Sequence, residues 1–473
     1  MTSINGDLCF AAGWQIRESV VRGAVTAVEV TKYFLDRITT VDPAIHSFIT
    51  IATDQALAQA TDVDRRLSAG ESVGPLAGVP VSVKDQFWTE GIRTTGGSRV
   101  FRDHVPGEDS LLVARLKAAD GIIIGKTNTP EFGTYWRSVN FVTEECLNPW
   151  DRSRTSGGSS GGAAASVAAG LGPLALGSDS GGSIRLPSAM CGVLGVLPSA
   201  GRVPRHGGFG SAMFLSTIGP IARDVRDAAT MLQLLAEPAA VDPFCRRDAA
   251  PDYLGDLDKG IAGARVAWWD YPLIARNLSA DVIAAVRSAA SGLAEFGGIV
   301  ADDPVVLDTD GVDDAWKVLD FCDRYADLGE RLCADAATRE LLAPYTKLRF
   351  DYAAGVSAVT YSRAVRRRAE FIREMECAFA GCDLLLSPTL GTIAPVIDPN
   401  DITQRIPAIV GYTVPVSFAG YSAASVPCGF VRDMPIGLQV IGRPNEEALV
   451  LRACRAFERA WPWAGKRPGV GAP

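Results

Sequence analysis

Two serines in one glycine-rich segment are the residues of this chain whose type and spacing first suggest chemistry. Ser159 lies in the run GGSSGG at 157–162, and Ser183 follows 24 residues later in the run SGGS at 180–183. A helix of about 11 residues and a strand of about five residues are both roughly 16 Å long, so an antiparallel return from helix to strand ends near its starting point. We therefore expect Ser159 and Ser183 to face one site.

The glycines that precede the second serine predict a set of convergent backbone donors. Because glycine has no side chain, the N–H groups of Ser180, Gly181 and Gly182 can approach a substrate oxygen closely, as in the oxyanion hole of an acyl-transfer enzyme. A plain turn between a strand and a helix would also explain these glycines. From the residues alone, the two interpretations stay open.

A serine nucleophile needs a base, and the chain offers two candidates. His206 is the only histidine near the glycine-rich segment, and Lys84 stands at the end of the strand expected within PLAGVPVSVKD at 75–85. To act as a base near neutral pH, a lysine needs a pKa about three units below its usual ~10.4, which requires burial and hydrogen-bonding neighbours. The end of an apolar strand can supply both, although a surface lysine paired with Asp85 is the simpler alternative.

Helices that alternate with short β-branched runs must position these residues. The runs at 75–85 and 121–125 predict strands, and the helical pattern SLLVARLKAAD between them predicts a helix-then-strand unit of a mostly parallel sheet. Apolar spacing predicts two or three helices over about 20–67 and a closing helix over 446–460. The chain therefore belongs to the α/β class.

Composition and charge exclude several classes of protein. The 473 residues carry 46 Lys and Arg against 54 Asp and Glu, a formal net charge of −8, which provides no positive surface for a nucleic-acid backbone. The ten cysteines show neither C-x-x-C nor zinc-ligand spacing, and no basic start followed by an apolar core opens the sequence. The weakly polar stretch 163–177 is too short to span a membrane. We expect a cytoplasmic protein with reduced thiols, no metal and no cofactor.

Taken together, these motifs resemble the amidase signature family over nearly the whole chain. Lys84 in GVPVSVKD, the run GGSSGG and the run GSDSGGSIRLPSAMCGVLGVLPSAGRV occur in the family's order, with the two serines 24 residues apart. The stretches GKTNTPEF at 125–132 and PIGLQVIGRP at 435–444 fit the family as well. Within it, the chain looks like bacterial aryl-acylamidases and hydrolases of polyamide oligomers and urethanes.

The resemblance implies one domain over residues 1–473 with an amidase signature fold, in which helices cover both faces of a central mixed, mostly parallel, twisted β-sheet. Its signature core would span 75–235, and a helical insertion at 305–378 would form a cap that shapes the substrate pocket. An apolar or aryl amide would suit the aromatic side chains we expect there. The expected pocket residues are Phe132, Tyr135, Trp136, Phe321, Tyr325, Tyr352 and the loop Arg205–Phe214.

The resemblance also implies a Ser–cis-Ser–Lys triad. Ser183 matches the nucleophile, Ser159 with a cis peptide bond before it matches the bridging serine, and Lys84 matches the base. Neutral Lys84 would take the proton of Ser183 through Ser159, and water would then hydrolyse the acyl-enzyme on Ser183. Supporting positions are implied at Asp179, Arg185 and Ser160.

The expected activity is hydrolysis of the C–N bond of an amide or carbamate. The enzyme would be a monomer or homodimer that binds a small molecule and neither nucleic acid nor membrane. An alternative with the same fold is the glutaminase component of glutamyl-tRNA amidotransferase, which works only within a complex. In that branch an acidic residue near YTVP holds the amino group of glutamine, whereas this chain has 409–411 (Ile-Val-Gly) there.

Two further classes fit the residues less well. An α/β-hydrolase is suggested by G-x-S-x-G at 157–161, but that motif needs an apolar strand before it and a later histidine. The preceding residues here are polar, and no histidine follows His206. A scaffold with an inactive site is disfavoured because the triad is intact.

Overall fold

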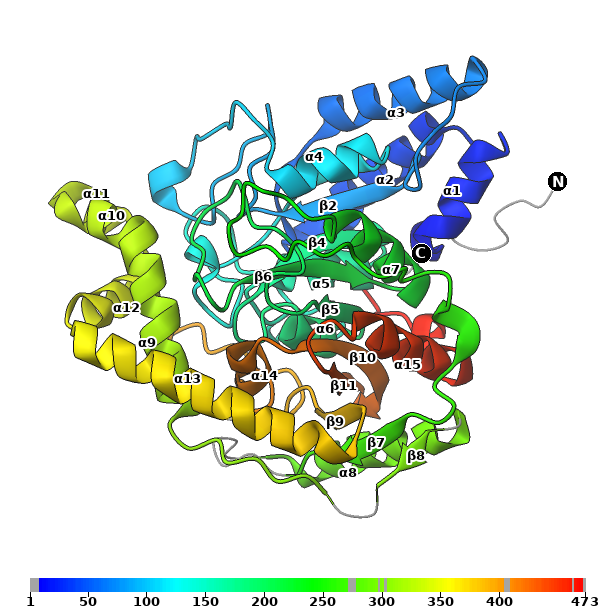
Figure 1. Ribbon diagram of the computed structural model, residues 1–473. Coiled ribbons are helices and arrows are strands. Elements are labelled where there is room, and N and C mark those ends of the chain that lie inside the picture. Colours follow the sequence, from blue (N-terminus) through cyan, green and yellow to red (C-terminus); the bar gives the residue numbers. More distant parts are fainter. Residues whose placement is uncertain are drawn as a thin grey trace.

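A mixed β-sheet of eleven strands runs through the centre of the molecule (Figure 1). The computed structural model describes residues 8–270, 278–296, 298–301, 304–403, 409–461 and 463–470. The strand order within these residues is β1-β3-β2-β4-β6-β5-β10-β11-β9-β7-β8. The strands are β1 (Phe48–Ile51), β2 (Pro80–Lys84), β3 (Ile122–Thr127), β4 (Leu174–Asp179), β5 (Leu194–Leu197), β6 (Thr217–Ala222), β7 (Arg265–Trp268), β8 (Ile299–Val300), β9 (Leu384–Pro388), β10 (Ser422–Val431) and β11 (Met434–Gly442).

The helices lie on both sides of this sheet (Figure 1). Strands β2, β3, β6 and β11 are buried at every position, which requires cover on both of their faces. The α-helices are α1 (Gly13–Val21), α2 (Ala27–Val41), α3 (Thr53–Ser68), α4 (Leu111–Ala118), α5 (Gly161–Ala168), α6 (Arg185–Cys191), α7 (Val225–Leu235), α8 (Ala280–Ser291), α9 (Val312–Arg324), α10 (Glu330–Ala334), α11 (Ala336–Leu341), α12 (Pro344–Ala354), α13 (Ala358–Ala378), α14 (Val414–Ala419) and α15 (Glu447–Ala460).

The expected mixed sheet with helices on both faces is confirmed, with one correction: the sheet is not mostly parallel. Among the described strands, six neighbouring pairs are antiparallel and four are parallel. The hairpin of β10 and β11 illustrates how an antiparallel pair arises in this sheet. Its two turn residues, Arg432 and Asp433, both have positive φ (50° and 60°), the conformation of a tight two-residue hairpin. Such a turn can join only antiparallel strands.

The strand and helix expectations nearest the glycine-rich segment are confirmed. β2 ends at Lys84, β3 follows helix α4, and the closing helix α15 spans Glu447–Ala460. The region 20–67 contains the expected helices, but strand β1, only four residues long, separates α2 from α3. Thr26 caps the N-terminus of helix α2: its Oγ1 accepts a hydrogen bond from Glu29 N (3.1 Å), while the Glu29 carboxylate accepts one from Thr26 N (2.8 Å).

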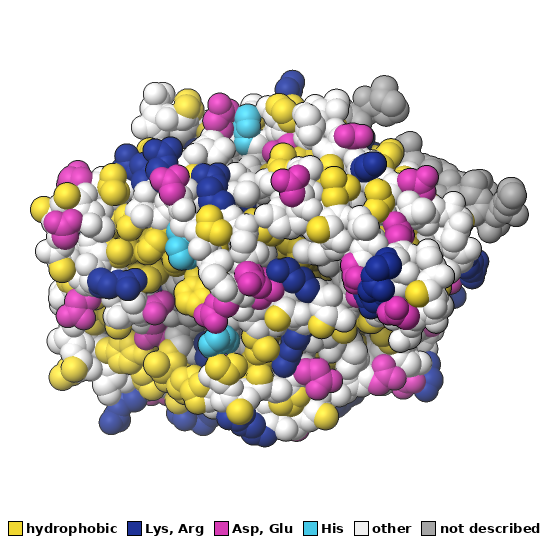
Figure 2. Space-filling view, turned by 90° about the horizontal axis from the view of Figure 1, so that it is seen from above, with side chains coloured by type: hydrophobic (Ala, Val, Ile, Leu, Met, Phe, Trp, Pro, Cys, Tyr) yellow, Lys and Arg dark blue, Asp and Glu magenta, His cyan; other side chains and the backbone are white. Residues whose placement is uncertain are grey.

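The insertion expected to be helical over 305–378 is helical from Val312 onward, whereas residues 305–311 form no helix and Val305 makes a β-bridge with Trp269. Its helices lie beside the sheet in Figure 1. A π-helical turn at Tyr325–Gly329 joins α9 to α10. No helix in the described ranges is long and apolar enough to cross a membrane. On the face seen in Figure 2, basic and acidic side chains are interspersed, in keeping with the modest net charge of −8.

Candidate active site

Lys84 lies at the centre of a buried cluster of hydroxyl groups. Its side chain is fully buried at the end of β2, and Nζ donates hydrogen bonds to Oγ of Ser159 (2.7 Å), Ser178 (2.8 Å) and Ser160 (3.0 Å). Burial, and next the positive charge of Arg324, lower the pKa of Lys84 well below its ordinary value. A neutral amine held against a serine hydroxyl can accept that serine's proton.

The structure brings the two serines of the glycine-rich segment together. Helix α5 leads away from Ser159, strand β4 returns, and Ser160 N donates to the carbonyl of Ser183 (3.1 Å). Ser159 and Ser183 both line one cavity of about 480 Å³. The Gly158–Ser159 peptide bond is cis, as the family resemblance implied.

Close packing explains the two glycines before Ser183. A Cβ at Gly181 would lie 2.6 Å from Cζ2 of Trp316, and one at Gly182 would lie 2.4 Å from Oγ1 of Thr413. Gly182 also has φ of +127°, a conformation that residues with a side chain rarely adopt. The loop is therefore pressed between α9 and the segment before α14, and both positions require glycine.

The backbone donors of this loop correct one sequence-based expectation. Gly182 N donates to Oδ1 of Asp179 (2.6 Å), so it is already engaged and is not available for a substrate oxygen. Within the described part of the chain, the N–H groups of Ser180, Gly181 and Ser183 have no acceptor. These groups remain available as donors to an oxyanion.

Asp179 and Arg185 form a fully buried ion pair under the loop. Arg185 donates to both carboxylate oxygens of Asp179 (3.0 Å each) and to Oε1 of Gln439 (2.6 Å). Although burial raises the pKa of Asp179, Arg185 and the N–H groups of Gly182 and Ile184 lower it more, so the net shift is downward. The pair thus fixes the turn that carries Ser183.

Replacing Arg185 by methionine should destabilise the protein by roughly 3–5 kcal/mol, because Asp179 would keep a buried charge without its cation. Urea unfolding followed by circular dichroism measures the change. The control is Arg22→Met, which removes an exposed partner of Glu18 and should leave the midpoint nearly unchanged. Equal midpoints for Arg185→Met and wild type would contradict the structural role of the pair.

The cavity wall differs from the aromatic pocket that the sequence suggested. Of the expected residues, only members of the loop Arg205–Phe214 line it, and the helical stretch contributes Asp323, Arg324, Ala326 and Asp327 instead. The other expected aromatic residues pack against aromatic rings, some of them against one another. Tyr135 stacks on Tyr345 (ring centroids 4.8 Å apart), and the remaining contacts are Phe132 with Phe101 and Phe209, Trp136 with Tyr135, Phe321 with Trp316 and Tyr352, and Tyr325 with Phe350.

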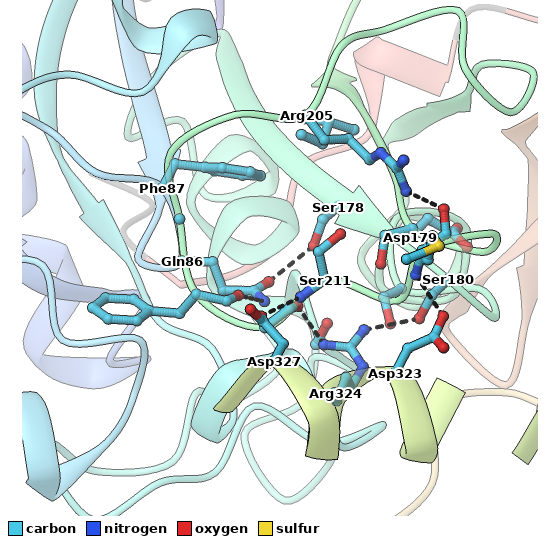
Figure 3. Close-up of a pocket in the computed structure, with 18 of the residues that line it drawn as sticks. Gln86, Phe87, Ser178, Asp179, Ser180, Arg205, Ser211, Asp323, Arg324 and Asp327 are labelled. Atoms are coloured by element: carbon cyan, nitrogen blue, oxygen red, sulfur yellow. Dashed lines mark hydrogen bonds between the residues drawn. The ribbon is translucent and has the colours of Figure 1, made fainter. Parts of the chain in front are cut away.

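Three polar residues of the site were missed from the sequence. Ser178 Oγ accepts a hydrogen bond from Lys84 Nζ. Figure 3 shows that Ser178 also donates to Oε1 of Gln86 (2.9 Å) and that Arg324 Nη2 donates to Oγ of Ser180 (3.2 Å). Ser178 lies next to Asp179 at the end of β4, and Gln86 lies two residues after Lys84, which ends β2. Polar residues at these strand ends could therefore have indicated the two site residues from the sequence. His206, the other candidate base, lines the cavity, but Lys84 is the group bonded to Ser159.

A comparison with known families identifies the group to which this geometry belongs. The family model described as Amidase matches residues 29–451. The chain belongs to the amidase family. It is therefore an enzyme that acts on the carbon–nitrogen bond of an amide.

Individual amidase-family relatives cover almost the whole chain. A glutamyl-tRNA(Gln) amidotransferase subunit of Roseiflexus sp. (strain RS-1) is 36% identical, covering 96% of this chain and 97% of its own. A structure from work on a vestigial protein complex and the origins of an s-triazine catabolic enzyme is 31% identical (TM-score 0.88; 95% and 99% covered). A bacterial aryl acylamidase of the amidase signature family is 29% identical (TM-score 0.87; 96% and 97% covered).

The first of these relatives corrects the expectation about partners. The sequence suggested a monomer or homodimer that binds a small molecule and no nucleic acid. The Roseiflexus relative is, by its name, one subunit of an enzyme of glutamyl-tRNA(Gln). Net charge describes the whole surface of one chain, so it is a poor guide to whether a chain works with partners.

Proposed function

We propose that the chain hydrolyses amides through an acyl-enzyme on Ser183. Ser183 Oγ attacks the carbonyl carbon while its proton passes to Ser159 and the proton of Ser159 passes to Lys84. The N–H groups of Gly181 and Ser183 hold the oxyanion, and the C–N bond breaks as Lys84 returns a proton through Ser159 to the leaving amine. Water then hydrolyses the acyl ester by the same proton path. The 2.7 Å hydrogen bond from buried Lys84 to Ser159 carries this proposal.

We infer that the substrate amide is the side chain of glutamine and that the chain works as the glutaminase component of a tRNA-dependent amidotransferase. The 36% identity to a glutamyl-tRNA(Gln) amidotransferase subunit over 96% of this chain supports the assignment. The cavity wall also carries side chains of both signs, Arg205 and the carboxylates of Asp323 and Asp327. Free glutamine bears an ammonium and a carboxylate group, and each needs an opposite charge when it leaves water. The acidic residue that holds the amino group of glutamine in the amidotransferase branch is absent at 409–411. In this proposal Asp323 and Asp327 take its place.

A specific observation favours a second candidate, an aryl amide. Phe87, Phe209 and Phe244 line the same cavity and present apolar surface to a substrate. The similarity to a bacterial aryl acylamidase points the same way. The two candidates differ in whether charged groups of the cavity contact the substrate.

Substrate preference separates the candidates. The protein, purified together with the partner subunits that the proposed complex implies, should release ammonia from L-glutamine with a kcat/KM at least ~10-fold above that for release of p-nitroaniline from p-nitroacetanilide, because a lost charge contact costs about that factor or more. Asp327→Asn should raise KM for glutamine and leave the anilide reaction unchanged. Asp256→Asn, at an exposed partner of Lys259, serves as the control. Anilide turnover without glutamine turnover, in protein whose Ser183 still reacts with a fluorophosphonate, would establish the aryl amidase instead.

We also propose a cap over the cavity and a cytoplasmic location. The segment 305–378 acts as a cap that shapes the cavity, and its residues Asp323, Arg324 and Asp327 in the cavity wall support this role. All ten cysteines are free thiols, which supports a cytoplasmic location.

A further inference from the structure

Arg324 connects the helical cap to the loops around the catalytic serines. It ends α9 and is buried, with a side chain only 7% exposed, and its Nε donates to both oxygens of Asp320 (3.1 Å each). Nη1 donates to the carbonyls of Phe132 (3.0 Å) and Gly210 (2.6 Å), and Nη2 to Oγ of Ser180 (3.2 Å). Figure 3 shows the guanidinium pointing from the helix toward Ser180. One side chain therefore ties α9 to three loops of the site.

The guanidinium also adds a permanent charge to a site that needs a neutral lysine. Two charged groups act on Lys84: Arg324 from α9, which disfavours the protonated amine, and Asp179 from β4, which favours it. The other polar partners of Lys84 are uncharged serines. Asp179 forms its ion pair with Arg185. A guanidinium carries a delocalised positive charge and only hydrogen-bond donors.

We propose that Arg324 is a positioning residue for the hydrolysis: it holds Ser180 and the loop at Gly210 against the cap, and it places a guanidinium in the wall of the cavity that Ser159 and Ser183 line. This inference rests on the proposed role of Lys84 as the base. The cap thereby contributes to the chemistry as well as to the shape of the cavity. Loss of the contact between α9 and Ser180 would move this charge away and make Lys84 easier to protonate.

The pH dependence of Ser183 labelling by an alkyl fluorophosphonate tests the proposal without knowledge of the natural substrate. The wild-type rate should rise with pH as Lys84 loses its proton. Arg324→Gln should move this rise to higher pH by about one unit, so that labelling on the acid side slows ~10-fold. Arg324→Lys, which keeps the charge but not the forked hydrogen bonds, should slow labelling and leave the rise near its wild-type pH.

A matched control is Arg339→Gln, which removes an arginine of the same cap that pairs with Asp351 on the surface. Its pH profile should match wild type. If Arg324→Gln does not fold because Asp320 is left unpaired, the double variant Asp320→Asn, Arg324→Gln replaces the ion pair by neutral side chains. Slower labelling with an unmoved pH profile in the folded variant would overturn the proposal. Absence of any wild-type labelling at Ser183 would instead refute the proposed hydrolysis.

Discussion

Alanine at position 183 is expected to lower amide turnover by about 10⁵–10⁶-fold, the loss seen when a serine hydrolase loses its nucleophile. Without Ser183 Oγ no acyl-enzyme forms, and the remaining donors can only polarise the substrate. Amide hydrolysis by purified Ser183→Ala and wild type, compared as kcat/KM, measures the effect. Ser183 is only partly buried on a loop, so we expect the variant to fold.

The matched control for this experiment is Ser211→Ala, which removes another serine hydroxyl from the same cavity wall. Its backbone N–H donates to Asp327 (3.3 Å), a contact that alanine keeps. Turnover by Ser211→Ala should stay within a few-fold of wild type. Comparable losses in both variants would mean that the cavity is sensitive to any change and that Ser183 has no special role.

Replacing Lys84 by alanine should reduce turnover by about 10²–10⁴-fold, the usual value of a positioned proton acceptor. Lys84→Arg should be no better than alanine, because arginine cannot release its proton in this pH range. The sign of the pH effect follows from the lowered pKa. Wild-type activity is present while Lys84 is neutral and is lost as pH falls through that pKa and the amine becomes protonated. A pH–rate profile of kcat/KM checks both statements.

Lys126 provides the control for burial itself. It is also fully buried, burial lowers its pKa to about 7, and its Nζ bonds Oγ1 of Thr89 (2.8 Å) and Thr94 (3.0 Å) instead of a cavity serine. Lys126→Met should lower stability but leave the pH profile of the folded enzyme in place. Wild-type activity in Lys84→Ala, or a profile that changes equally in both lysine variants, would remove Lys84 from the mechanism.

Local sequence was enough to locate the catalytic segment because its elements follow one another along the chain. The apolar run before Lys84 forms β2, and the helix-then-strand return from Ser159 forms α5 and β4. The glycines at 181 and 182 match positions where the backbone meets Trp316 and Thr413. The partners were not readable in advance, because Trp316 and Thr413 lie more than 130 residues further along the chain.

Contacts between distant segments explain what the sequence did not reveal. Arg324 lies 144 residues after Ser180, and nothing in the local pattern of α9 distinguishes it from an ordinary i,i+4 partner of Asp320. The aromatic residues expected in the cavity pack against other aromatic rings. The stacking of Tyr135 on Tyr345, for example, depends on how α12 meets the loop before Tyr135. The use of Gly182 N by Asp179 depends on loop geometry that composition does not encode.

The most direct test of this account is to locate the residue that carries the covalent intermediate. Wild-type protein treated with an alkyl fluorophosphonate, digested and analysed by tandem mass spectrometry, should carry one equivalent of phosphonate on Ser183. Ser183→Ala should carry none, and Lys84→Ala should react on the same serine but far more slowly. An adduct on Ser159 or on another serine, with Ser183 unmodified, would contradict the assignment.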